Sequence, residues 1–403
     1  MKPRYYSLDV FRGATVALMI MVNNPGTWAY MFAPLKHAPW HGCTPTDLVF
    51  PFFLFAVGNA MSFVIPRLQE AGDGVFWTKV IKRTILIFLI GLGLNWFPFV
   101  QWVDQAWQFR EWVNPSDPER GVRILGVLQR IALAYFFASI LAYYLKPKNL
   151  ILVSAILLFA YWGLCAFLGT GDPYSLEGWF GTDIDKQILG VAHMYKGEGI
   201  PFDPEGLIST LPAIIQVVFG YLVGVFIKNQ GQVNWLWKKV PSSTEHHFKL
   251  LSGLMVTGFI LIVLGWTWSL GFPINKKIWT SSYVLYTTGL ASLCIGTMIW
   301  YIEVQGVKNW LTKFFDVFGK NPLFIFVLSG VFADLLDFIR IPNGVNEQGI
   351  PITIHPLTWF YKNICAQIPG PPELGSFVFS LCFVAFMWAI CYWLDKKKIY
   401  IKV

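Results

Sequence analysis

Long apolar runs separated by short polar segments dominate the pattern along this chain. A helix that crosses a bilayer needs roughly 20 mostly apolar residues. Ten runs meet that need, in 12–31, 47–66, 83–100, 124–145, 150–169, 207–227, 250–270, 280–301, 318–337 and 376–394. A further segment, 355–367, is short and polar, so we expect it at the interface or partly inserted. The pattern predicts an all-α fold: a polytopic transmembrane bundle of about ten spans, forming one domain over residues 1–403.

Composition agrees with lipid as the main solvent. Hydrophobic residues make up 55% of the 403 residues, and charged residues only 13%, where soluble domains have roughly 25%. The six cysteines contain no CxxC pair, so we expect neither a disulfide framework nor a metal site. The net charge of +8 does not indicate nucleic acid, because the basic residues recur in short clusters between apolar runs.

The positions of Lys and Arg predict an orientation for the bundle. With a cytoplasmic N-terminus, the inside segments hold 19 of the 31 basic residues and the outside segments hold ten. Cytoplasmic loops carry such an excess, so both termini are expected in the cytoplasm. The start of the chain lacks a cleavable signal pattern, and we expect its first apolar run to remain as a span.

Two basic residues fall within predicted spans, where charge is costly and usually functional. Arg12 lies three residues after Asp9, a spacing that puts both on one helix face and allows an ion pair. Arg130 follows Gln129 and has no acidic partner in its own span, so it needs a carboxylate elsewhere or an anionic ligand. These basic residues are candidates to meet an anionic cofactor.

The densest polar cluster joins the outer end of the first span to the start of the second. It holds Asn23, His37, Trp40, His41 and Asp47. A histidine can take a proton from an amine, a carboxylate can orient the imidazole, and an amide can donate to an oxyanion, so the cluster suits acyl transfer. Simpler roles stay open: Asp47 could cap a helix, His37 could bond to backbone, and Trp40 could anchor the interface.

Segments spread over nearly the whole chain resemble, in the same order, the heparan-α-glucosaminide N-acetyltransferase family with its bacterial NagX-like members. They are Ser7-Leu-Asp-Val-Phe-Arg-Gly, Met21-Val-Asn23, Lys36-His-Ala-Pro-Trp-His-Gly, Asp47-Leu-Val-Phe-Pro-Phe-Phe, Gly121 to Arg130, Asp203-Pro-Glu-Gly, Pro273 to Tyr283 and the basic tail from Lys396. The resemblance implies a transmembrane N-acetyltransferase that moves acetyl from cytosolic acetyl-CoA to glucosamine, or a glucosamine-ended saccharide, on the far side.

The same resemblance implies roles for individual residues. His37 matches the family's active-site histidine, and Asn23 and Asp47 match its asparagine and aspartate. We expect Arg12, Gln129, Arg130 and Lys276 near acetyl-CoA, with Lys276 able to meet the acceptor instead, and Trp40 and His41 near the acceptor sugar. His41 departs from the animal enzyme, which has Asn at that position, and this bears on which acceptor is used.

Other assignments follow less directly. The lumenal extension of the animal enzyme is absent, which suggests a bacterial inner membrane; a homodimer is allowed. An amino-sugar transporter is an alternative, although its midplane should hold broken helices and several acids. An O-acyltransferase of a cell-surface glycan is a second alternative. A purely structural scaffold would leave Arg130 and the histidine cluster unexplained.

Overall fold

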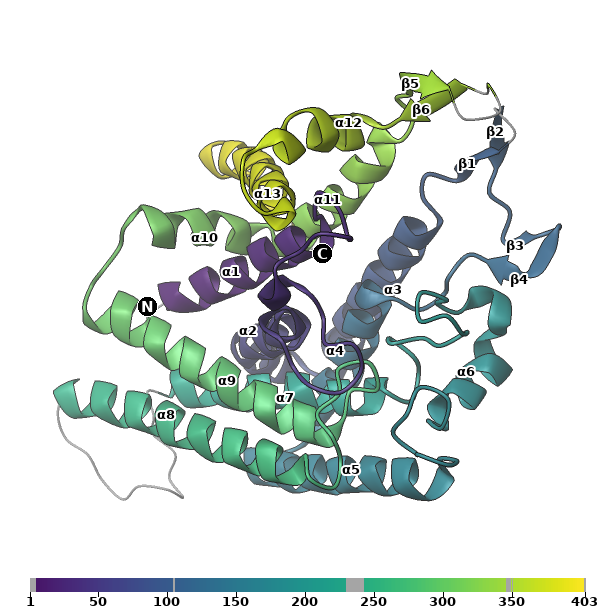
Figure 1. The fold of residues 1–403 in the computed structure, drawn as a ribbon. Helices are drawn as coiled ribbons and strands as arrows, with labels where there is room; N and C mark the ends of the chain where they lie inside the picture. Colours follow the sequence, from purple (N-terminus) through teal and green to yellow (C-terminus); the bar gives the residue numbers. More distant parts are fainter. Residues whose placement is uncertain (1–4, 104–105, 230–242, 346–348, 350, 402–403) are drawn as a thin grey trace.

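The computed structural model describes residues 5–103, 106–229, 243–345, 349 and 351–401. Over these residues the chain is mostly helical (Figure 1). The α-helices are α1 (Tyr6–Asn23), α2 (Val49–Ala71), α3 (Asp73–Trp96), α4 (Val127–Tyr144), α5 (Pro147–Leu168), α6 (Gly181–Leu189), α7 (Thr210–Lys228), α8 (Ser243–Trp268), α9 (Ser281–Ile299), α10 (Trp310–Lys320), α11 (Pro322–Leu336), α12 (Pro356–Asn363) and α13 (Pro372–Lys396). The basic residues Lys2, Arg4, Lys238, Lys239 and Lys402, which count toward the predicted orientation, lie outside the described residues.

Within the described residues, three antiparallel hairpins interrupt the helices, a feature that the all-α expectation omitted. They pair β1 (Val100–Val103) with β2 (Ala106–Phe109), β3 (Val113–Asn114) with β4 (Asp117–Gly121), and β5 (Ile341–Val345) with β6 (Pro351–Ile354). All three lie in segments that were expected to be outside loops. The valine and aromatic residues of β1 and β2 favour extended backbone, which suits exposed two-stranded ribbons.

Seven helices in the described part of the chain are long and apolar enough to cross a membrane. They contain the predicted spans 47–66, 124–145, 150–169, 207–227, 250–270, 280–301 and 376–394, nearly in full. An eighth crossing is reached if α10 and α11 count as one bent span. The chain is therefore a helical membrane-type bundle, and the count of ten remains a prediction.

Three predicted spans differ from the structure for local reasons. The helix expected over 12–31 is α1, which ends at Asn23 because Pro25 and Gly26 follow. The helix expected over 83–100 is α3, which starts ten residues earlier. Because it contains Lys79, Lys82 and Arg83, α3 carries more charged residues than a helix that crosses a membrane usually has. The one expected over 318–337 is broken at Asn321, where α10 and α11 meet at 82°.

Small residues let the central helices approach closely. A Cβ on Gly58 of α2 would lie 2.0 Å from the carbonyl oxygen of Val217 in α7, and one on Gly220 would lie 2.2 Å from that of Phe55. Glycines at such crossings allow backbone contact between membrane helices. The pair α2 and α7 forms the centre of the main hydrophobic cluster, to which α1, α3, α4, α9 and α13 also contribute.

Polar contacts sort the connecting segments into two ends of the bundle. At one end, Trp40 bonds to Tyr174, Arg123 to Asp203, and Gly26 to Ser376. We call this the His37 end. At the other, the terminal end, the contacts join Ser7 to Glu303, Asp73 to Tyr143, Ser62 to Lys228, and Lys320 to Asp395. Successive long helices thus run alternately between the two ends, as a multi-spanning chain requires.

Candidate active site

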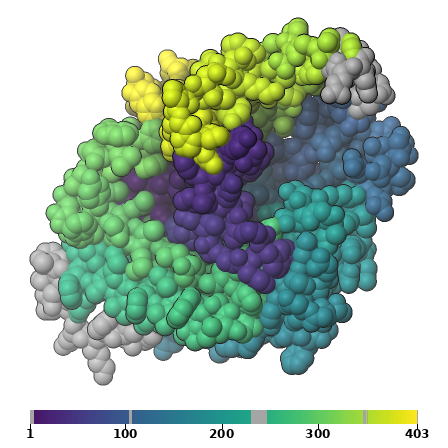
Figure 2. Space-filling view, viewed as in Figure 1, coloured from purple at the N-terminus to yellow at the C-terminus, as the bar shows by residue number. Residues whose placement is uncertain are grey.

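The loop that carries the polar cluster, residues 24–48, reaches the surface on one face of the molecule, where it is drawn in purple between the yellow-green C-terminal segment and the green and teal segments (Figure 2). Its turns are fixed by side chains. The Thr46 hydroxyl donates to the Pro34 carbonyl at 3.0 Å, and the Thr44 hydroxyl lies 2.7 Å from the Lys36 carbonyl. The loop is therefore an ordered platform, although it contains little regular structure.

His37 and Asp47 form the central pair of this loop. Imidazole Nδ1 lies 2.6 Å from carboxylate Oδ1. The other oxygen, Oδ2, accepts the backbone N–H groups of Ala38 and Thr44, each at 3.0 Å. The side chain of Asp47 is 2% exposed and that of His37 is 42% exposed. A buried, fully bonded carboxylate thus holds an accessible imidazole, and with Nδ1 facing the carboxylate, Nε2 is left to accept a proton.

The expectation that Asp47 could cap a helix is met at the same time. It follows Thr44 by three residues at the start of the short 3₁₀ turn Pro45–Leu48, and its carboxylate accepts the Thr44 backbone N–H. Capping uses Oδ2 and the imidazole uses Oδ1, so one side chain serves both roles. Tyr283 of α9 fixes the backbone beneath it, because its hydroxyl donates to the Asp47 carbonyl at 2.5 Å.

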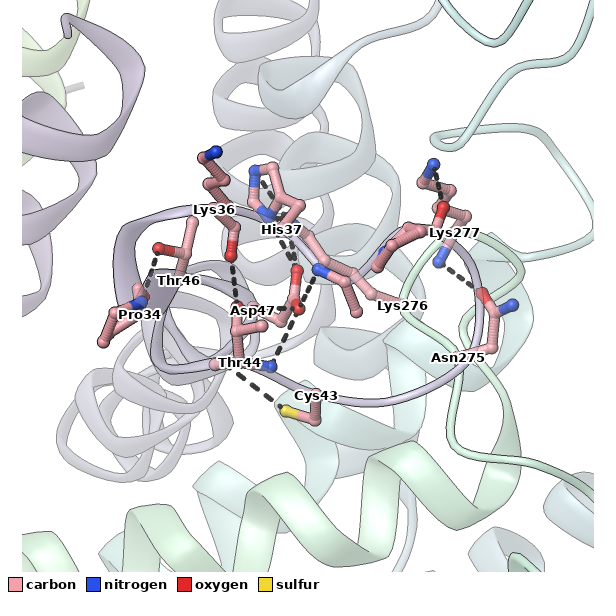
Figure 3. Close-up of polar contacts among 12 residues, drawn as sticks. Pro34, Lys36, His37, Cys43, Thr44, Thr46, Asp47, Asn275, Lys276 and Lys277 are labelled. Carbon is pink, nitrogen blue, oxygen red and sulfur yellow. Dashed lines mark hydrogen bonds and ion pairs between the residues drawn. The ribbon is translucent and has the colours of Figure 1, made fainter. Parts of the chain in front are cut away.

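A lysine from far along the chain completes the group. Lys276 Nζ lies 3.2 Å from His37 Nδ1, 3.4 Å from His37 Nε2 and 3.7 Å from Asp47 Oδ1. Figure 3 shows these three side chains converging above the loop. Asn275 shapes the turn that presents Lys276, since its buried side-chain oxygen accepts the N–H groups of Lys277 at 2.7 Å and Ile278 at 3.1 Å.

The surroundings tune two groups beside the histidine. Burial lowers the pKa of Lys276, although Asp47 and Glu205 act in the opposite direction. Burial, assisted by Asp47, raises the pKa of the Cys43 thiol to about 12. Cys43 therefore holds no thiolate near neutral pH, and the candidate bases or nucleophiles of this cluster are the His37 imidazole and the Lys276 amine.

The two residues expected to meet an acceptor sugar lie beside this group. Trp40 is half-buried: its indole donates to the Tyr174 carbonyl at 2.7 Å and its ring packs on Phe202 at 5.5 Å. His41 is exposed, with Nδ1 3.4 Å from the Asn275 amide. Burial lowers the pKa of His41 despite the opposing charge of Asp172.

Asn23 has a different position from the one expected of an oxyanion donor. It is the last residue of α1, is exposed, and no polar contact among the described residues links it to His37. The next residue, Asn24, instead donates back to the Ile20 carbonyl at 2.8 Å. A role for Asn23 in holding a carbonyl oxygen remains a prediction.

Arg12 lies at the terminal end. It pairs with Asp9 at 2.7 Å, as its spacing suggested, and donates to the Gly319 carbonyl of α10. It borders a recess of about 740 Å³ between α1, α2 and the end of α7, which Arg67 and Lys228 also line. Volumes of this size suit small-molecule ligands. Among the described residues, by contrast, no group of three His, Cys, Asp or Glu side chains is placed to hold a metal ion.

Gln129 and Arg130 are buried and lie apart from that recess. Gln129 donates to the Ile124 carbonyl at 2.9 Å. Arg130 is fully buried; it bonds to the Ser209 hydroxyl and to the Gly206 carbonyl at 3.2 Å, and it lies over the Trp279 ring. Its own helix contains no carboxylate; those that interact with its charge belong to Asp185, Asp203 and Glu205. Contact of Gln129 or Arg130 with an anionic cofactor remains a prediction.

Several residues around the site were not singled out in the sequence. Lys277 Nζ donates to the Pro39 carbonyl at 2.7 Å and to the Glu198 carboxylate at 2.5 Å. These two bonds connect segment 195–205 to the His37 loop. Glu205 pairs with Arg123 at 2.5 Å. The doubled lysine at 276–277 and the acid-rich turn at 203–205 were visible, but only the folded chain shows that these distant segments meet.

Comparison with known proteins identifies the family. Residues 4–252 match the family described as "Heparan-alpha-glucosaminide N-acetyltransferase, catalytic". The chain is 26% identical over 391 residues to the human heparan-alpha-glucosaminide N-acetyltransferase, and 26% identical over 393 residues to the mouse protein of that name. Each alignment covers 83% of this chain and 54% of the relative, so the chain spans about half the length of the curated relatives it matches.

The matched region contains α1, α2, α4 and the His37–Asp47 pair, while Lys276 lies beyond it. The family match agrees with the resemblance that was inferred from the order of motifs along the sequence. The resemblance drawn from the sequence is thereby confirmed: the chain belongs to the catalytic family of heparan-alpha-glucosaminide N-acetyltransferases.

Proposed function

We propose that this protein is a membrane-embedded N-acetyltransferase. It takes acetyl from acetyl-CoA at the terminal end and delivers it to the amino group of glucosamine, or of a glucosamine-ended saccharide, at the His37 end. The observation that carries this proposal is the pairing of an exposed imidazole with a buried, capped carboxylate and a lysine within 3.2 Å of the ring. The names of the human and mouse relatives indicate that the transferred group is acetyl and that the acceptor is a glucosaminide.

The chemistry needs one base and one oriented thioester. The acceptor nitrogen attacks the thioester carbonyl carbon, forming the amide C–N bond as the C–S bond breaks. Its proton passes to His37 Nε2, and the imidazolium returns that proton to the departing thiolate, which leaves as free CoA thiol. Asp47 stabilises the imidazolium through Nδ1. A two-step variant places the acetyl on Nε2 first and then on the amine.

The recess at the terminal end supports entry of acetyl-CoA from that side. Its lining includes Arg12, Arg67 and Lys228, and cations of this kind attract phosphates. The helices α1 and α2, which line it, are the two that the His37 loop connects. From Arg12 to Asn23 the helix advances roughly 16 Å, so this recess and the His37 loop lie at opposite ends of one short helical pair.

The proposed orientation keeps ten crossings with both termini in the cytoplasm. In the part of the chain that the structure describes, nine long helices and the bent α10–α11 pair alternate between the two ends, which supports the count. Basic side chains at the terminal end, including Lys228, Lys313 and Lys320, suit a cytoplasmic face. We place the protein in a bacterial inner membrane, with the His37 loop on the outer side.

Proteoliposomes test the function directly. Acetyl-CoA is supplied on the side of the terminal end and chitotriose, a glucosamine trisaccharide, on the other. We expect N-acetylated trisaccharide and free CoA in equal amounts, together with thermal stabilisation of the protein by both acetyl-CoA and CoA. Glucosamine crossing the membrane without use of acetyl-CoA would identify a transporter instead. A product cleaved by hydroxylamine would identify an ester and hence an O-acyltransferase.

A further inference from the structure

The amine of Lys276 is a nucleophile that the proposed transfer does not use. Its Nζ lies 3.4 Å from His37 Nε2, the atom that takes the proton of the attacking amine, and 3.2 Å from Nδ1 of the same ring (Figure 3). A glucosamine amine that gives its proton to Nε2 must come within hydrogen-bond distance of the same atom. A primary amine of the chain itself therefore lies where the acceptor amine is to react.

The turn that carries Lys276 is anchored on both sides of the lysine. Asn275 is buried, and its backbone N–H donates to the Thr280 hydroxyl at 3.0 Å. The Lys276 carbonyl accepts the backbone N–H of Trp279, which is also buried, at 3.2 Å. The Lys276 side chain extends from this turn to His37 and remains 21% exposed. The amine is thus held beside the imidazole and still within reach of a substrate.

The next residue, Lys277, is a natural comparison because it has the same side chain and different partners. Its Nζ donates to the Glu198 carboxylate at 2.5 Å and to the Pro39 carbonyl at 2.7 Å, and acetylation would break both bonds. Lys276 Nζ lies 3.7 Å from Asp47 Oδ1, an oxygen that already bonds to the imidazole at 2.6 Å. This longer contact is weaker, so less is lost when the Lys276 amine is acetylated.

An amine must be neutral when it attacks a thioester. Burial lowers the pKa of Lys276, although Asp47 and Glu205 act in the opposite direction. A larger share of this amine is therefore neutral near physiological pH than of an exposed lysine. The imidazole 3.4 Å away can take the proton that the amine loses on attack. The glucosamine acceptor of the proposed function needs the same two conditions.

We propose that Lys276 is a self-acetylation site, modified when acetyl-CoA is present and no acceptor sugar occupies the His37 end. Nζ attacks the thioester carbonyl carbon, and the amide C–N bond forms as the C–S bond breaks. The Nζ proton passes to His37 Nε2 and then to the thiolate, which leaves as free CoA thiol. The inference rests on the N-acetyltransferase function proposed above and adds a modification that slows it.

The product explains why the modification acts as a switch. An amide nitrogen is neutral and no longer nucleophilic, so each chain reacts once. The acetyl group then occupies the space of the acceptor amine, and the positive charge beside Asp47 is lost. The acetylated chain should transfer acetyl to sugar about tenfold more slowly than the unmodified chain.

The test uses the full-length protein and acetyl-CoA with a ¹³C-labelled acetyl group, without any sugar. Peptide mass spectrometry should find one labelled acetyl on Lys276 and an equal amount of free CoA, while Lys277 in the same molecules stays unlabelled. Chitotriose added at the start should suppress the label, because both amines need His37 Nε2. In His37→Ala the labelling rate should fall about 10²-fold. The same chain unfolded in denaturant gives the background, in which the two lysines should label alike.

Activity supplies a second readout. After incubation with acetyl-CoA alone, the unaltered chain and Lys277→Arg should transfer acetyl to chitotriose about tenfold more slowly than before it. Lys276→Arg has no primary amine at this position and should keep its own starting rate through the same incubation. This comparison of each variant with itself separates the modification from any effect of the substitution.

The outcomes distinguish this inference from the function on which it rests. Equal labelling of Lys276 and Lys277 in the folded chain, or labelling that is as fast in His37→Ala, would overturn the inference. Transfer to chitotriose without label on Lys276 would overturn it too and would leave the proposed function in place. Label on Lys276 without transfer to any sugar would support it and would overturn the proposed acceptor.

Discussion

Two clusters of charged side chains lie at the same end of the bundle and differ in their access to solvent. In the first, Asp47 is buried but the imidazole it holds is 42% exposed, with Lys276 beside it. In the second, Arg130 is fully buried against Ser209. A reacting group must be reached by its substrate, so the first cluster is suited to chemistry. The second cluster is suited to holding α4 against the turn at residues 203–206.

The difference shows the limit of a general rule. Ionisable residues inside membrane helices are functional by default, and this rule singles out Arg130. Yet its bonds are to Gly206 and Ser209, and the neighbouring carboxylates of Asp203 and Glu205 are themselves bonded to Arg123. A buried ion network of this kind costs a great deal to break and does not by itself indicate a ligand.

Asp47→Asn should have the largest effect on rate. An asparagine can still accept the backbone N–H groups, but its amide donates to Nδ1 and forces the imidazole proton onto Nε2, where it blocks the base. We expect kcat to fall by about 10³- to 10⁴-fold, with the Kd for acetyl-CoA unchanged. Single-turnover transfer and acetyl-CoA titration measure the two quantities. Near-normal kcat would show that Asp47 only caps its helix.

Arg130→Met should chiefly affect stability. Removing the guanidinium takes away the buried bonds to Gly206 and Ser209, at a cost of about 1–3 kcal/mol in the free energy of unfolding. Unfolding in detergent with chemical denaturant measures this loss, and Arg130→Lys should recover part of it. Acetyl-CoA should bind the folded fraction with a Kd within about twofold of normal. A Kd raised tenfold or more would instead support the predicted contact between Arg130 and the cofactor.

Lys276→Met should alter the pH dependence of transfer. The charged amine lies 3.2 Å from His37 Nδ1 and 3.7 Å from Asp47 Oδ1, beside the proposed base. Burial lowers the pKa of Lys276, so its charge is lost at a lower pH than for an exposed lysine. Without the lysine, the decline of kcat/KM at high pH that accompanies loss of this charge should disappear, and the rate at pH 7 should fall about tenfold. Lys277→Met, one residue away, is the control, and an identical profile shift there would remove the specific role of Lys276.

Asp185→Asn should have the smallest effect, confined to the pH dependence of stability. Burial raises the pKa of Asp185 to about 7, from 3.8 when unfolded. The folded chain therefore holds a proton that the unfolded chain has lost between about pH 4 and pH 7, and stability falls as pH rises through that window. Asparagine has no proton to lose, and its oxygen can keep the bond from Leu207. The fall in thermal midpoint between pH 5 and pH 8 should be a few degrees smaller in the variant.

Much of the fold was predictable because lipid imposes a simple pattern on sequence. Seven predicted spans correspond to helices long enough to cross, and the Asp9–Arg12 pair followed from helical spacing. Asn321-Pro322 reads as the end of a helix in the sequence, but the 82° angle between α10 and α11 could not be predicted, because hydropathy does not detect a change of direction. The hairpins were missed because short exposed ribbons have no hydrophobic period to detect.

The site was predictable in part for a similar reason. His37 and Asp47 are ten residues apart, and their pairing could be inferred from local chemistry and from family resemblance. The approach of Lys276 depends on a contact between residues 239 positions apart, which one sequence does not reveal. Asn23 was grouped with His37 on its chemistry and on family resemblance; it is the exposed last residue of α1, and its role stays a prediction.

One measurement tests the central claim most directly: acetyl transfer and acetyl-CoA binding in His37→Ala, in the full-length protein reconstituted in lipid, with His41→Ala as the matched control. An exposed imidazole held by Asp47 is the proposed base, so transfer to chitotriose should fall by at least about 10³-fold. The Kd for acetyl-CoA should stay within about twofold of normal, and His41→Ala should keep most of its turnover. Turnover at the normal rate in His37→Ala, with the same Kd, would contradict the account.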